Sequence, residues 1–163
     1  MEERTPEASR PDSDEADVDD QFRALLEGLR TTIPGALVLF SFLLILPLEA
    51  TFGDITDLDT IVFYVAFISA GIASTLLIAP SVHQRVRAPI SGIRRTTWNH
   101  VMIAAKLTIA GTAFLLISVS AVVYLVTSLV FTPPFAVAAT IVVAGVTTWA
   151  WFYLPLFGFS RDS

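Results

Sequence analysis

The longest apolar run of the chain reads LTIAGTAFLLISVSAVVYLVTSLVF, residues 107–131, and its 25 positions hold no charged side chain. A helix needs about 20 such residues to cross roughly 30 Å of hydrocarbon. A further 24 uncharged residues follow at 135–158, and 19 precede the run at 61–79. A fourth run, residues 33–48, is shorter and counts as a span because of its flanks. These four segments predict an all-α integral membrane protein with four transmembrane helices.

The composition agrees with a membrane protein of one domain. Apolar residues make up 54% of the 163 residues and the mean hydropathy is +0.69, whereas about 45–50% apolar residues are usual in soluble domains. The chain has no cysteine, which excludes disulfides, thiolate metal sites and thiol catalysis. Because the first run follows some thirty residues with an acidic start, we interpret it as a retained span and not as a signal peptide.

The first twenty residues are strongly acidic. Residues 1–20 carry nine acidic side chains against two arginines, a net charge of −7. A segment with so few apolar residues cannot bury enough surface to fold alone, so we predict a disordered acidic N-terminal tail. A regulatory or partner-binding arm is the alternative interpretation.

Residues 21–31 have a different character. Phe22, Leu25, Leu26 and Leu29 are spaced for one face of a helix. This spacing predicts a short amphipathic helix that lies in the inner headgroup region before the first span. Pro34 favours a break between the two helices, although one continuous bent helix fits the pattern as well.

The membrane domain is expected over residues 21–161, as an antiparallel bundle. Its spans are predicted at about 33–48, 61–79, 104–130 and 135–157. The second span is expected to end at Pro80, and a central loop is expected to cover residues 81–100.

Two connections on the other side of the membrane carry turn and capping residues. The Thr132-Pro133-Pro134 sequence is short enough to force the last two helices into an antiparallel hairpin. Asp59 and Thr60 are available to cap the second helix, since short polar side chains can accept the unpaired N–H groups of a first turn.

All ten basic residues lie before the first span, near the central loop, or after the fourth span: Arg4, Arg10, Arg23, Arg30, Arg85, Arg87, Arg94, Arg95, Lys106 and Arg161. Basic residues near span ends resist translocation, so both termini and the central loop are predicted to be cytoplasmic in a multi-pass protein of the cell membrane. Trp98, Trp149 and Trp151 fall at the same predicted interface, where tryptophan is enriched.

No Asp, Glu, His or Arg lies in the core of a predicted span. Since intramembrane ionisable residues mark most transport pathways, the pattern argues against an autonomous ion-coupled carrier. Glu49 follows the first span, and Lys106 lies about one turn inside the third, where it can snorkel to the headgroups or form an ion pair. His83 and His100 are a weak metal signal without neighbouring Cys or carboxylate. With no cofactor or catalytic motif in the sequence, we do not expect an enzyme.

Two features point to contacts with other molecules. The candidate contact residues for anionic lipid headgroups or a protein partner are Arg85, Arg87, Arg94, Arg95, His83 and Lys106. The same arginines can equally serve only to enforce topology, and they are too few for nucleic-acid binding.

Small residues at three- and four-residue spacing let helices approach closely. They include Ala66, Ala70, Ala73, Ala104, Gly111, Ala139, Ala144 and Gly145. Most are expected to assemble the bundle, and a face left over would serve self-association or binding of a partner.

Several motifs resemble a family of small four-span prokaryotic membrane proteins classed as a domain of unknown function. The motifs are LLEGLR at 25–30, Gly35, LFSFLLILP at 39–47, LLIAP at 76–80 with His83 and Arg85 after it, and WFYLPL at 151–156. The resemblance covers about residues 21–161. Members of the family typically have His next to Arg after Ala-Pro, whereas Gln84 intervenes here. Some members are labelled sodium:proton antiporters, but the resemblance implies no established catalytic residue.

The most consistent interpretation of the sequence is an accessory or interaction component of the cytoplasmic membrane. A small ion transporter or channel subunit, similar to an antiporter, is the alternative.

Overall fold

The computed structural model describes residues 11–48, 56–90 and 98–158, and every element in these ranges is helical. The long helices are α1 (Pro11–Ile45), α2 (Asp57–Ile90), α3 (Trp98–Val130) and α4 (Pro133–Thr148). A short 3-10 turn, η1 (Leu46–Leu48), ends the first helix, and a π-helical segment, η3 (Trp149–Gly158), continues the fourth. All four helical units are long and apolar enough to cross a membrane. The predicted all-α architecture with four membrane-spanning helices is therefore confirmed.

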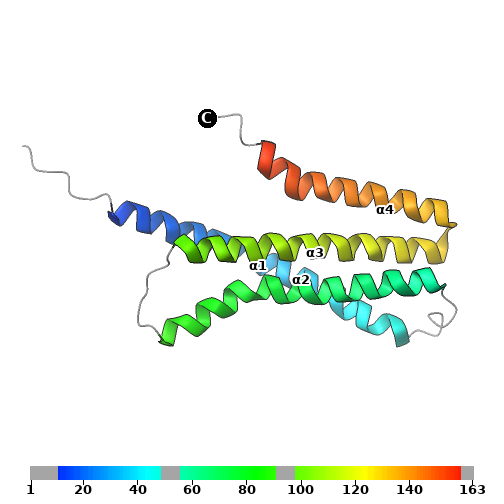
Figure 1. Cartoon of the computed structure of the whole chain (residues 1–163), viewed down its shortest axis with the longest axis horizontal. Helices are drawn as coiled ribbons and strands as arrows, with labels where there is room; N and C mark the ends of the chain where they lie inside the picture. Colours follow the sequence, from blue (N-terminus) through cyan, green and yellow to red (C-terminus); the bar gives the residue numbers. More distant parts are fainter. Residues whose placement is uncertain (1–10, 49–55, 91–97, 159–163) are drawn as a thin grey trace, which may run out of the picture.

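The helices form an antiparallel bundle with α2 and α3 at its centre (Figure 1). Contact is most extensive between α2 and α3; α1 packs mainly on α2, and α4 packs on α3. The predicted hairpin is confirmed, since α3 and α4 are separated only by Phe131 and Thr132. One end of the bundle, which we call the charged end, holds the start of α1, the end of α2 and the start of α3. The other end holds the turn between α3 and α4.

The structure joins the predicted amphipathic helix and the first span into one helix. Pro34 lies inside α1, where membrane helices tolerate proline because neighbouring groups compensate for the lost N–H. Leu29 and Ala36, on either side of Pro34, are buried in one cluster with Leu77 and Leu115. The apolar face that was expected to lie among headgroups packs instead on the bundle, and this packing holds the helix together through the proline.

The helical structure also begins earlier than expected. The start of α1 at Pro11 makes residues 11–20 helical, although they were predicted to be disordered. Proline suits the first position of a helix, and acidic side chains near a helix N-terminus interact favourably with its dipole. These local effects extend a helix that the bundle already anchors. The prediction for residues 1–10 lies outside the described residues.

The expected central loop is mostly helical. The second helix continues through Pro80 to Ile90, and α3 begins at Trp98, so the structure contradicts a loop over 81–100. Proline has a helical φ angle and removes one hydrogen bond, so it bends a helix whose flanking turns are stable rather than ending it. Figure 1 shows α2 bending near its end and diverging from α3.

Small residues of α2 line its seam with α3. Ala66, Ala70 and Ala73 are fully buried, and the hydroxyl of Ser118 donates to the Ala66 carbonyl at 2.9 Å. Interhelical bonds of this kind contribute about 0.6 kcal/mol on average in a membrane protein. By contrast, α4 fully buries only Ala136 among its described residues, whereas Ala139 and Ala144 are half-buried and Gly145 is exposed.

Candidate functional site

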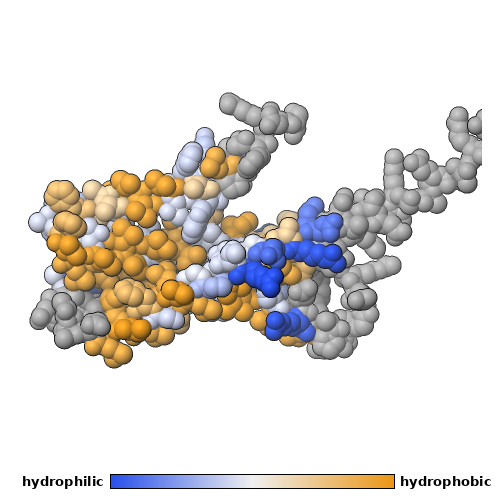
Figure 2. Space-filling model, turned by 180° about the vertical axis from the view of Figure 1, so that it is seen from behind, coloured by the Kyte–Doolittle hydropathy of each residue, from blue (hydrophilic) through white to orange (hydrophobic). Residues whose placement is uncertain are grey.

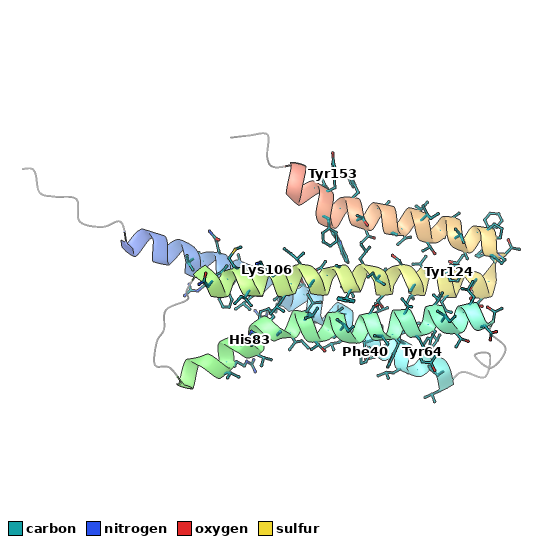
Figure 3. The ribbon with its side chains drawn as sticks, in the orientation of Figure 1. Phe40, Tyr64, His83, Lys106, Tyr124 and Tyr153 are labelled. Carbon is teal, nitrogen blue, oxygen red and sulfur yellow. The ribbon has the colours of Figure 1, made fainter. Side chains whose placement is uncertain are left out.

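The predicted contact residues that the structure describes lie at the charged end. His83 and Arg85 are in the last turns of α2, and Lys106 is in the first turns of α3; all three side chains are exposed. Figure 3 shows His83 and Lys106 at this end, and Tyr64 and Tyr124 toward the other. No hydrogen bond or ion pair joins these three residues in the described part of the chain. The side chain of Arg87, as well as Arg94 and Arg95, lies outside the described residues.

The basic residues of the charged end differ in their electrostatic surroundings. The two ion pairs of the described ranges are both within α1, Arg23 with Asp20 at 4.0 Å and Arg30 with Glu27 at 3.7 Å. All four side chains are highly exposed, so each pair contributes little to stability. Arg85, in contrast, has no carboxylate within ion-pair distance among the described residues. Among the arginines whose side chains the structure describes, the charge of Arg85 is therefore the one with no carboxylate beside it.

Hydrophilic residues gather at one end of an otherwise apolar surface. Figure 2 shows apolar side chains over most of the bundle and strongly hydrophilic ones beside the charged end. Large apolar side chains such as Val38, Ile141 and Val142 are more than 60% exposed. A soluble protein rarely exposes an apolar surface of this extent, so the distribution fits helices surrounded by lipid.

The opposite end holds a buried carboxylate that sequence reasoning did not single out as a site. Asp59 is 8% exposed and accepts a hydrogen bond from the Thr56 hydroxyl at 2.7 Å and one from the Ser128 hydroxyl at 2.9 Å. The Asp59 N–H in turn donates to the Thr56 hydroxyl at 3.2 Å. Asp59 thus links the first turn of α2 to the last turn of α3.

The cap of α2 is Thr56, and the expected capping by Asp59 and Thr60 was wrong. The Thr60 hydroxyl donates to the Thr56 carbonyl at 3.1 Å, within the helix. The signal was present in the sequence, because Thr-x-x-Asp is the spacing of a capping box. No sequence pattern could show that the same carboxylate also reaches Ser128, 69 residues further along the chain.

Neither a metal centre nor an enclosed polar cavity is evident in the described ranges. No group of three His, Asp or Glu side chains there lies close enough to hold a metal ion, and the side chain of His100 is outside those ranges. The surface carries two open, apolar grooves. One is lined by Ile68, Gly71, Ile72, Thr75 and Leu76. The other is lined by Val62, Val65, Ser120, Ala121, Tyr124 and Thr140. Both suit acyl chains better than polar substrates.

The fold and the distribution of charge define the class of the protein, a small multi-pass membrane protein built as a four-helix bundle. The chain belongs to a family of unknown function, DUF6328, whose model matches residues 11–155. This match confirms the family resemblance inferred from the sequence motifs. A comparison with the curated proteins and with the solved structures found no match.

Proposed function

We propose that the protein works by interaction, as a non-enzymatic accessory component of the cytoplasmic membrane. One observation supports this most directly. Between Arg30 and Leu48, between Thr60 and Val82, and from Leu107 to Gly158, the described residues include no Asp, Glu, His, Lys or Arg. Transporters usually place such residues on the path of their substrate. The central parts of the described spans therefore lack groups of the kind that usually bind and release an ion, whereas Asp59 and Lys106 lie toward span ends.

Many hydroxyl groups of the described spans are also engaged within the bundle. Within single helices, six hydroxyls donate to the backbone carbonyl four residues earlier: Ser74, Thr75, Thr108, Thr112, Ser120 and Thr140. Ser118 donates across the seam to Ala66. A hydroxyl bonded to a carbonyl of its own helix has its proton satisfied locally, and these hydroxyls do not form a chain of hydrogen bonds with one another. This arrangement favours an interaction protein over a carrier.

The proposal includes the orientation in the membrane. The charged end would face the cytoplasm, with both chain termini, because it carries the basic residues that resist translocation. The basic side chains at the end of α2 and the start of α3, Arg85 and Lys106 among them, would contact anionic lipid headgroups. A second copy or another membrane protein would be the protein partner.

Single-cysteine labelling tests this orientation in a chain that has no cysteine of its own. Asp57 and His83 are both exposed and lie at opposite ends of α2. In intact cells, a membrane-impermeant maleimide should label Asp57→Cys, whereas His83→Cys should react only after permeabilisation. Labelling of both variants in intact cells would contradict the four-span orientation with cytoplasmic termini.

Reconstitution tests the choice between interaction and transport. Purified protein in liposomes should show no ion flux driven by a pH or sodium gradient, and affinity purification in mild detergent should recover a membrane partner or a second copy. The alternative, an antiporter-like transporter or channel subunit, predicts a robust flux. Loss of such a flux in Lys106→Ala, but not in a matched Arg23→Ala variant, would overturn the proposal.

A further inference from the structure

Residues 81–90 form a helical segment that turns away from the bundle at the charged end. They follow Pro80, which is fully buried inside α2 and lacks the N–H that would bond the carbonyl of Leu76. A missing bond of this kind is a common cause of a helix bend. The end of α2 diverges from α3 in Figure 1, so the segment is not held against the centre of the bundle.

The described side chains of this segment combine exposed apolar residues with basic ones. Val82 and Val86 are 47% and 54% exposed, and four residues separate them, so they lie on the same side of the helix. His83 and Arg85 are exposed beside them. The sequence from 81 to 100 contains no acidic residue. Apolar residues on one side with basic residues nearby are the pattern of a helix that lies on a membrane surface.

The position of the segment identifies the surface that it meets. The apolar span of α2 ends at His83, so the segment begins where the helix would leave the hydrocarbon. The corresponding apolar face of α1 is different, because Leu29 is only 2% exposed and packs on Leu77 and Leu115. Val82 and Val86, in contrast, stay exposed at the level where the apolar span of α2 ends.

We propose that residues 81–90 are an interfacial lipid-binding helix, with Val82 and Val86 among the upper acyl chains and Arg85 at the phosphates of anionic lipids. This inference rests on the proposed function, which places the charged end at the inner leaflet. It goes further by assigning one segment, one face and one chemical partner, an anionic phospholipid surface. It also assigns the surface-helix role to the end of α2 in place of residues 21–31.

Spin labels on the full chain test the proposal directly. Single cysteines at positions 82, 84 and 86 carry the label, in vesicles of phosphatidylcholine alone or mixed equally with phosphatidylglycerol. With phosphatidylglycerol, labels at 82 and 86 should be more accessible to oxygen than to an aqueous nickel complex. The label at position 84, half a helical turn away, should show the reverse. Equal access to the nickel complex at all three positions would overturn the proposal, and so would exclusion of both reagents at 82 and 86, which indicates a protein partner.

Two arginine variants provide a matched control. Arg85→Gln should weaken membrane partition of the segment roughly fivefold, and only in vesicles that contain phosphatidylglycerol, since a basic group near an anionic surface contributes about 1 kcal/mol. Arg23→Gln should change nothing, because Arg23 already has Asp20 as a neighbour at 4.0 Å. An equal effect of both variants would overturn the specific role of Arg85. The labels report only this segment, so flux in the reconstitution assay would refute the proposed function without affecting this result.

Discussion

Replacing Gly111 with leucine is expected to lower the free energy of unfolding by about 3 kcal/mol, since overpacking a tight contact typically costs 1–3 kcal/mol and occasionally more. A Cβ at position 111 would lie 2.9 Å from Cγ of Leu77 and 3.2 Å from Cβ of Leu76. Leu77 is fully buried and cannot turn away. The added side chain would therefore force α2 and α3 apart along their seam. Unfolding of the purified protein in mixed detergent micelles would measure the loss.

Gly145 supplies the matched control for Gly111. It also lies in an apolar helix, α4, but a Cβ there would meet nothing within 4 Å. Alanine is better than glycine in a helix interior by roughly 0.5–1 kcal/mol. Gly145→Ala should therefore be neutral or stabilising, whereas Gly111→Ala should destabilise. Equal effects of the two alanine variants would show that the seam can relax and that close approach at Gly111 does not contribute to stability.

Replacing Asp59 with alanine is expected to destabilise the bundle by about 2 kcal/mol. Hydrogen bonds to a charged group contribute about 1.5–3 kcal/mol, and Asp59 accepts bonds from Thr56 and from Ser128 on the neighbouring helix. Asp59→Asn should lose less, because the amide keeps an acceptor oxygen and adds a donor. Hydrogen exchange at the end of α3 should rise in Asp59→Ala together with the loss of stability.

Variants of Asp57 and Ser128 distinguish the helix-dipole contribution of Asp59 from its hydrogen bond to α3. Asp57 is an exposed acid in the same first turn, so Asp57→Ala removes the dipole contribution alone, about 0.3–1 kcal/mol. A double-mutant cycle of Asp59→Ala with Ser128→Ala then measures the coupling between α2 and α3. If Asp57→Ala and Asp59→Ala cost the same and the cycle shows no coupling, the link to Ser128 has no energetic role.

The number and order of the helices could be predicted because both depend on local properties. An uncharged run such as 107–131 must form a helix in a membrane, where each backbone N–H and C=O needs a partner within its own segment. The connection at Phe131 and Thr132, followed by Pro133 at the start of α4, is too short for anything but a hairpin between α3 and α4. The position of the charged residues outside the apolar runs can likewise be predicted, because it is a property of the sequence order alone.

The pairing of faces could not be predicted, because periodicity shows which residues share a face and not which neighbour covers it. Gly111 and Gly145 look equivalent in the sequence, but only Gly111 meets another helix closely. Leu29 and Val82 both belong to amphipathic segments next to a span, and the bundle buries the first and leaves the second exposed. Thr56 and Asp59 had the spacing of a capping box, but the contact of Asp59 with Ser128 required the folded chain. These outcomes depend on how α1 and α3 pack on α2, which brings together residues that are far apart in the sequence.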